Sequence, residues 1–106
     1  MVEYDTGEVD FVVNVNPLLA IPKTDTEVRP VLDCTRGGVN GALAPWGMAL
    51  PTIETILGVL RPGWYLGKRD LRHGFYHLVV DPSERKHFGF CHPATGQIGR
   101  FTVLIM

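Results

Sequence analysis

Glycine, proline or charged residues interrupt every apolar run of this chain, which has 12 Gly and 8 Pro among its 106 residues. Because glycine and proline disfavour the interior of helices and strands, only short elements fit between them. No run of about 18 apolar residues remains, which excludes a membrane-spanning helix. The hydrophobic fraction, 45%, is ordinary for a globular protein and predicts one small folded domain rather than a disordered chain.

Two segments of the sequence predict β-hairpins. In the first, the apolar runs 18–21 and 28–32 flank a polar tetrad of Lys, Thr and Asp that suits a turn. Pro30 within the second run indicates an edge strand or a strand end. In the second hairpin, the runs 87–91 and 98–104 flank Pro-Ala-Thr-Gly. Short antiparallel strands are therefore the main expected elements.

One clear helix is expected after Pro51, a residue that suits the first turn of a helix. Its apolar residues recur at the helical spacing and form a stripe that we expect to pack in the core: Ile53, Ile56, Leu57 and Leu60. Residues 64–70 and 75–80 are interpreted as two further strands. Asp81 begins a short capped turn in which Glu84 is the reciprocal cap. The expected fold class is α+β.

Charge is distributed unevenly, although the formal net charge is only −1. Residues 1–33 hold seven acidic and two basic residues, whereas residues 34–106 hold four acidic and eight basic ones. The basic part could face a polyanion, but the small net charge argues against a dedicated nucleic-acid-binding domain. The first ten residues carry four acids and no base. We therefore expect residues 1–15 to be an acidic, solvated and even disordered lead-in, and residues 16–106 to form the domain.

The two cysteines, Cys34 and Cys91, form neither a disulfide framework nor a zinc-type spacing. The first residues of the chain lack the basic and apolar regions of a secretory signal. We therefore expect an intracellular protein of the cytoplasm or nucleus, with no membrane association.

The most unusual local feature is a basic and aromatic segment, Lys68-Arg69-Asp70-Leu71-Arg72-His73-Gly74-Phe75-Tyr76. A carboxylate at the end of a predicted strand is a common way to hold Mg²⁺, with phosphate and water in the other positions. The alternative is that Asp70 forms a surface ion pair with one of the neighbouring bases, Lys68, Arg69 or Arg72. The residues alone leave both interpretations open.

Four segments, taken in order, resemble the reverse transcriptases of retroelements. Residues 17–36 resemble the fingers hairpin of that family, and residues 49–57 its Pro-Leu-Pro-x-Ile helix start. Residues 68–78 are similar to the first palm motif, Lys-x-Asp-Leu-x-x-Gly-Tyr/Phe, and residues 84–104 to the segment that follows it. The resemblance covers residues 16–106, and the ordered set is far more specific than any one piece. It implies a partial fingers and palm fragment.

Carried over position by position, the resemblance implies a role for each matching residue. Asp70 would be one of three palm carboxylates that bind two Mg²⁺ ions, and the backbone carbonyl of Leu71 would be a further ligand. Phe75 would lie under the sugar of the incoming nucleotide and select deoxynucleotides, because its ring collides with a ribose 2′-OH. Lys23 and Arg29, on the two arms of the fingers hairpin, would bind the triphosphate.

Three of these residues also have a simpler interpretation. Lys23 is an ordinary turn residue, and Arg29 can pair with Asp33 or Glu27. Phe75 has β-favouring neighbours and can belong to the core. Only the family resemblance favours the site roles over these structural ones.

The family carries its second and third palm carboxylates in a Tyr-x-Asp-Asp turn that does not occur in this sequence. One carboxylate is a poor site for Mg²⁺, which keeps its waters unless several oxygens replace them. We therefore expect a fragment of an RNA-directed DNA polymerase that is inactive alone. Its partners in the complete enzyme would be template–primer, deoxynucleoside triphosphates, Mg²⁺ and the rest of the polymerase. The alternatives are a remnant that binds nucleic acid or a polymerase without catalysis, and a degenerate remnant with no role.

Overall fold

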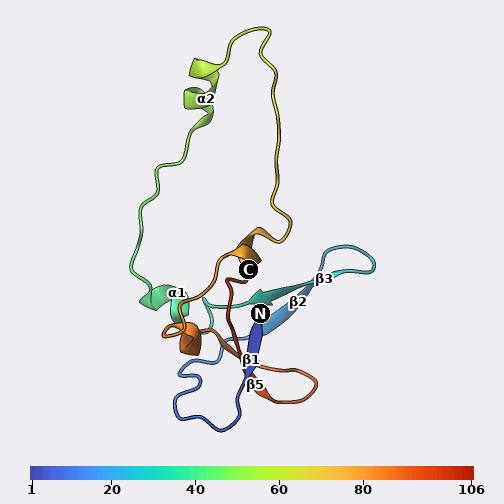
Figure 1. Ribbon diagram of the computed structural model, residues 1–106, viewed down its shortest axis with the longest axis vertical. Helices are drawn as coiled ribbons and strands as arrows, with labels where there is room; N and C mark the ends of the chain where they lie inside the picture. Colours follow the sequence, from blue (N-terminus) through green and yellow to red (C-terminus); the bar gives the residue numbers. More distant parts are fainter.

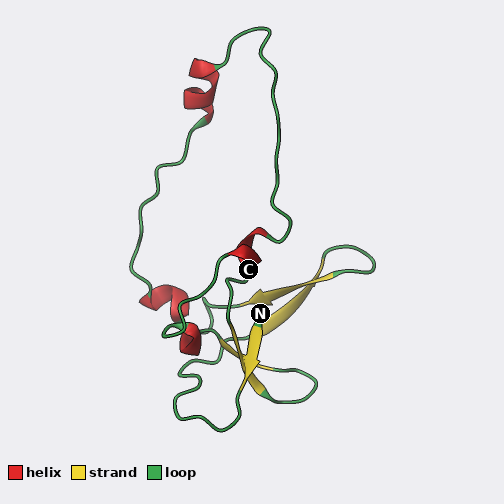
Figure 2. Ribbon diagram, viewed as in Figure 1, coloured by secondary structure: helices red, strands yellow, loops and turns green.

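The computed structural model describes residues 1–106 and consists of short strands and helices joined by long loops (Figures 1 and 2). Five strands form two antiparallel sheets: β1 (Val2–Tyr4), β5 (Ile98–Phe101) and β4 (Gly89–Cys91) in the order β1-β5-β4, and β2 (Leu18–Pro22) with β3 (Val28–Leu32). The helices are α1 (Val39–Ala42), α2 (Ile53–Val59) and the 3₁₀ helices η1 (Gly74–His77) and η2 (Arg85–His87). The expected fold class is confirmed at the level of a small α+β domain with short antiparallel strands.

Both predicted hairpins are confirmed. β2 and β3 pair in a register that sets Leu18 opposite Leu32. The turn between them closes through the Thr24 hydroxyl, which accepts a hydrogen bond from the Glu27 backbone N–H at 3.0 Å. Because this sheet has only two strands, each is an edge strand, as Pro30 in β3 predicted.

Aromatic residues of β4 and β5 form the centre of the core. The ring centroids of Phe90 and Phe101 are 4.8 Å apart, and Leu32 at the end of β3 packs against them. Gly99 pairs with Phe90 across the hairpin, and a side-chain carbon at this glycine would lie 2.7 Å from the Phe90 ring. The Tyr4 ring meets Phe90 edge-on at a centroid distance of 6.2 Å. Residues of both sheets therefore share one small core.

The buried side-chain amide of Asn16 connects the segment before β2 to β4 through hydrogen bonds. Asn16 is 1% exposed, and its Nδ2 donates to the backbone carbonyls of His87 and Gly89 at 3.0 and 3.1 Å. Gly37 lies so close to the Asn16 side chain that any side chain at position 37 would collide with it. The polar group is thus fully paired in the interior, as the cost of burying an unpaired amide requires. Sequence reasoning assigned Asn16 no role.

The prediction of a solvated lead-in is wrong for residues 2–4, which form β1 and pair with β5. The Glu3 carboxylate accepts hydrogen bonds from Arg85 Nη1 at 2.8 Å and from Arg100 Nε at 2.9 Å. These arginines, the hydrogen bond from Arg100 first, hold the pKa of Glu3 below its ordinary value. The partners are 82 and 97 residues away in the sequence, so no local pattern reveals them. The domain boundary between residues 15 and 16 stays a prediction.

Residues 44–70, which we call the outer segment, leave the rest of the molecule and return to it (Figure 1). All of them are exposed except Leu60, which is half-buried. The radius of gyration is 18.5 Å, whereas a compact domain of this length has one of about 13 Å. α2 lies at the far end, where Ile53 is 72% and Leu57 63% exposed. The prediction that the apolar stripe of this helix packs in the core is wrong.

α2 itself forms where the sequence predicts a helix, because its N-terminus is capped locally. The Thr52 hydroxyl accepts a hydrogen bond from the Thr55 backbone N–H at 3.2 Å, and Glu54 lies in the first turn. A hydroxyl cap and an early carboxylate both suit the positive end of a helix. No helix of this structure has the length and apolar character needed to cross a membrane.

Two predicted strands are absent. Residues 64–70 form no strand, because no other strand lies beside them to supply hydrogen bonds. Residues 75–80 begin instead inside η1, and only Val79 forms a bridge, with Val103. The β-favouring side chains of residues 64–70 are therefore not sufficient to make a strand without a neighbour, and those of residues 75–80 give only the short pairing of residues 78–80 with residues 102–104.

Candidate functional site

A groove with a volume of about 1000 Å³ lies between the β2–β3 hairpin and the chain that follows the outer segment. Residues of the hairpin form one wall, and residues 70–76 with Leu78 form the other, while Met106 also lines the groove. Every residue that the sequence singled out as a site residue lines this groove: Lys23, Arg29, Asp70, Leu71 and Phe75. The structure thus brings together residues that lie far apart in the sequence.

The hairpin presents two cations to the groove, of which Lys23 forms an ion pair and Arg29 does not. Lys23 Nζ lies 3.4 Å from the Glu27 carboxylate, and both side chains are about half exposed. Arg29 forms no ion pair, and its Nη1 donates only to the Met106 sulfur, a weak acceptor, at 3.6 Å. The alternative that Arg29 pairs with Asp33 or Glu27 is therefore not realised. Most donors of its guanidinium remain free for a ligand.

Asp70 stands where the outer segment rejoins the groove, and it is exposed. It forms no ion pair, although bases flank it on both sides. The alternative of a surface ion pair with Lys68, Arg69 or Arg72 is therefore not realised either. Leu71, next to it, is 71% exposed. The groove thus holds an uncompensated carboxylate as well as the two hairpin cations.

The carboxylates of the groove are the side chains that could contribute to a Mg²⁺ site. Nowhere in the structure do three or more His, Cys, Asp or Glu side chains come together in a way that could hold a metal ion. Asp70 and Glu27 are the only carboxylate side chains of the groove, and Glu27 is paired with Lys23. Mg²⁺ demands about six oxygen ligands in octahedral geometry, so Asp70 and the Leu71 carbonyl would leave most positions to other groups.

Phe75 belongs to η1 and is 50% exposed in the groove, so it is not an ordinary core residue. Backbone hydrogen bonds hold the turn that presents it. The Tyr76 N–H donates to the His73 carbonyl at 2.9 Å, and the Leu78 N–H donates to the Phe75 carbonyl at 3.1 Å. A half-exposed ring on a fixed turn offers a flat apolar surface to a ligand.

Sequence reasoning missed an aromatic pair in the same groove. The rings of His73 and Tyr76 are stacked, with centroids 5.5 Å apart and an interplanar angle of 15°. His73 has φ +54° and ψ +46°, a left-handed conformation that few residues other than glycine adopt. The sequence signal is weak, because histidine is only somewhat favoured in this conformation and Gly74 is the more obvious candidate for it.

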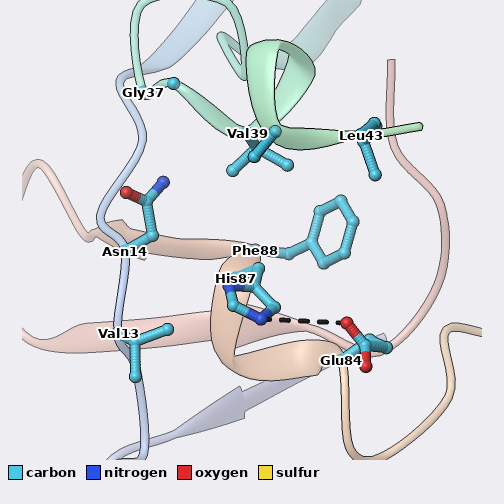
Figure 3. A pocket seen from close by; sticks show the side chains of 10 residues that line it. Val13, Asn14, Gly37, Val39, Leu43, Glu84, His87 and Phe88 are labelled. Carbon is cyan, nitrogen blue, oxygen red and sulfur yellow. Dashed lines mark ion pairs between the residues drawn. The ribbon is translucent and has the colours of Figure 1, made fainter. Parts of the chain in front are cut away.

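A second cavity, of about 580 Å³, lies between α1 and η2 (Figure 3). Val39 and Leu43, from α1 and its C-terminal end, face Phe88 across it. At its edge, His87 Nε2 lies 3.7 Å from the Glu84 carboxylate. This cavity is mainly apolar and contains none of the residues that the sequence singled out for a site.

Of the two capping residues predicted for the turn before η2, only Asp81 accepts hydrogen bonds from that turn. Asp81 accepts hydrogen bonds from the Ser83 hydroxyl at 2.6 Å and from the Ser83 backbone N–H at 2.9 Å, and these bonds lower the pKa of Asp81. Glu84, expected as the reciprocal cap, faces His87 instead. Neither carboxylate lines the groove, so the turn serves the fold rather than the candidate site.

Comparison of the chain with family models, with curated proteins and with solved structures finds no match in any of the three. The sequence motifs and the geometry of the groove therefore carry the functional argument. Together they place three cations, Lys23, Arg29 and Arg72, an unpaired carboxylate and a half-exposed aromatic ring in one groove. This set suits a ligand that carries phosphates and also a flat or apolar portion.

Proposed function

We propose that this chain is the fingers and first palm segment of a retroelement-type RNA-directed DNA polymerase, and that its groove binds a deoxynucleoside triphosphate. One observation carries the proposal. The residues that the motifs single out, Lys23, Arg29, Asp70, Leu71 and Phe75, line one groove although they come from separate parts of the chain. A chance resemblance of sequence gives no reason for such convergence. The α+β class by itself adds nothing, because many unrelated domains share it.

The triphosphate binds at the hairpin wall. Arg29 supplies a planar guanidinium that no carboxylate occupies, and Lys23 supplies a compact charge on a flexible stem. A phosphate can displace Glu27 from Lys23, because an exposed pair of this kind contributes at most about 1 kcal/mol. Hydrogen bonds between these cations and phosphate oxygens are roughly twice as strong as neutral ones.

The sugar and the reacting end of the nucleotide lie at the other wall. The half-exposed ring of Phe75 contacts the sugar and excludes a 2′-hydroxyl, which makes the groove selective for deoxynucleotides. Asp70 contributes one carboxylate to an Mg²⁺ site that other residues of a complete polymerase finish. Because no Tyr-x-Asp-Asp turn occurs in this sequence, we expect the chain to bind a nucleotide without extending a primer.

Isothermal titration calorimetry of the chain with dATP and with ATP tests the proposal. We expect dATP to bind, and Arg29→Ala to weaken its binding about tenfold through the loss of charge-assisted hydrogen bonds. Arg61→Ala is the matched control, because Arg61 is an exposed arginine of the outer segment that does not line the groove. Phe75→Ala should raise the affinity for ATP toward that for dATP.

Two results would overturn the nucleotide site: no binding of dATP at millimolar concentration, or an equal effect of Arg29→Ala and Arg61→Ala. A primer–template assay with Mg²⁺ and all four deoxynucleotides tests the predicted lack of catalysis. We expect no extension by the chain alone. Extension that Asp70→Asn abolishes would contradict that expectation and would make this chain sufficient for the reaction.

A nucleic-acid-binding remnant is the second candidate function. It is favoured by three exposed bases in one short stretch that form no ion pair: Lys68, Arg69 and Arg72. Such bases can contact a phosphate backbone, and the resulting affinity falls steeply with salt because bound counterions are released. Undetectable or salt-independent binding to DNA and RNA would remove this candidate and leave the nucleotide proposal in place.

A further inference from the structure

The roles proposed above leave one feature of the groove without a function, the stacked rings of His73 and Tyr76. Both residues line the groove together with Lys23 and Arg29. Their centroids are 5.5 Å apart and their planes are 15° from parallel. His73 is exposed, so the pair is not a piece of the core. It is a flat aromatic surface in a groove that also carries cations.

The backbone holds this pair in place at an energetic cost. His73 has φ +54° and ψ +46°, a conformation that strains a residue with a Cβ atom. The Tyr76 N–H donates to the His73 carbonyl at 2.9 Å, and His77 Nε2 lies 3.0 Å from the Arg72 carbonyl. Contacts on both sides of residue 73 therefore maintain the strained turn. Strain of this kind concentrates at ligand sites, where surrounding contacts fix a side chain for its task.

We propose that the His73–Tyr76 ring pair is a stacking platform for the nucleobase of a nucleotide whose phosphates bind Lys23 and Arg29. The inference rests on the proposed nucleotide site and adds to it the position of the base. Aromatic side chains accept any base, because every base has a π-face, and the larger purines offer more area for stacking. The platform therefore binds all four deoxynucleotides and favours purines.

The test compares two probes that share their phosphates, dATP and inorganic tripolyphosphate. The wild-type chain should bind dATP about tenfold more tightly, the effect of stacking one base on an aromatic side chain. His73→Asn removes the ring, and asparagine tolerates the left-handed backbone. This variant should lose the tenfold preference for dATP and keep the affinity for tripolyphosphate. Tyr76→Leu should act in the same way, whereas Tyr76→Phe, which keeps a ring, should bind like the wild type.

The outcomes separate the platform from the phosphate site. An equal loss for both probes in His73→Asn would show that the ring only supports the groove, and would overturn the platform. Equal wild-type affinity for dATP and tripolyphosphate would also overturn it, while the phosphate contacts of the proposed function would stand. If neither probe binds a chain whose circular dichroism shows that it is folded, the proposed function fails, and the platform fails with it.

Discussion

The outer segment is about as rich in apolar residues as the two sheets and the loops around them. The two regions differ in burial, because the apolar residues of the outer segment are exposed and those at the centre of the sheets are buried. Phe90 and Phe101 in the sheet are 2% and 3% exposed, whereas Trp46 and Tyr65 in the outer segment are 91% and 99% exposed. Each strand has a partner, while the outer segment has one seven-residue helix between stretches broken by Gly and Pro. Apolar content leads to burial only where the backbone brings two apolar faces together.

The candidate groove lies where these two regions meet. Its hairpin wall belongs to a paired sheet, and its other wall begins with Asp70 at the end of the outer segment. Lys23 and Arg29 are thus carried by a hydrogen-bonded hairpin, whereas Asp70 lies on chain that has no paired neighbour. It follows that the hairpin wall, where we propose that phosphates bind, is the better fixed of the two walls before a ligand arrives.

The largest effect that we expect from this contrast is on proteolysis. Brief treatment with chymotrypsin should cut after Trp64 or Tyr65 well before it cuts after Phe90 or Phe101. Exposed chain needs no unfolding before cleavage, whereas the sheet must open, so the two rates should differ by a factor on the order of a thousand. Mass spectrometry of the earliest fragments measures this. Cuts at Phe90 as early as those at Tyr65 would contradict the expectation that the sheet protects its chain from cleavage and the outer segment does not.

Truncation of one apolar side chain in each region should give the next largest difference. Phe90→Ala removes a ring that is 2% exposed and should lower the free energy of unfolding by about 3–5 kcal/mol. Leu57→Ala removes a side chain that is 63% exposed and should change it by less than about 0.5 kcal/mol. Urea unfolding followed by circular dichroism compares the two variants. A loss of more than about 1 kcal/mol in Leu57→Ala would show that α2 packs against the rest of the chain.

The same contrast explains which elements the sequence predicts. The β2–β3 hairpin, the β4–β5 hairpin and the start of α2 are predicted correctly, because turn residues and caps such as Thr24 and Thr52 act on their immediate neighbours. β1 and the exposure of the α2 stripe are not predicted, because they depend on which distant segment lies alongside. The arginines that pair with Glu3 lie 82 and 97 residues away in the sequence, and the exposed side chain of Ile53 packs against no other segment.

The candidate site follows a similar division. The place of five residues in ordered motifs predicts them as site residues, and they share one groove: Lys23, Arg29, Asp70, Leu71 and Phe75. The stacking of His73 on Tyr76 could not be predicted in that way, because it depends on a left-handed backbone at a histidine. Residue spacing alone places the two side chains three positions apart and does not indicate that their rings are parallel.

The smallest expected effect concerns the charge that joins β1 to the sheet. The pKa of Glu3 lies below its ordinary value of 4.5, first because of the hydrogen bond from Arg100. A carboxylate with a lowered folded-state pKa stabilises the fold above pH 4.5, and the contribution disappears as the pH falls through the folded-state pKa. Because the Glu3 side chain is 36% exposed, solvent screens its pairs, and Glu3→Gln should cost only about 1 kcal/mol at neutral pH.

The difference in unfolding free energy between Glu3→Gln and the wild type should therefore be largest at neutral pH, shrink as the pH falls below 4.5, and vanish once the pH has passed the folded-state pKa of Glu3. Urea unfolding at a series of pH values measures it. Glu8→Gln is the matched control, because Glu8 is exposed and its carboxylate accepts a side-chain hydrogen bond only from the Thr6 hydroxyl. Its stability should follow that of the wild type at every pH. If the two variants behave alike, the arginine pairs do not fasten β1, and this strand resembles the outer segment more than the sheets.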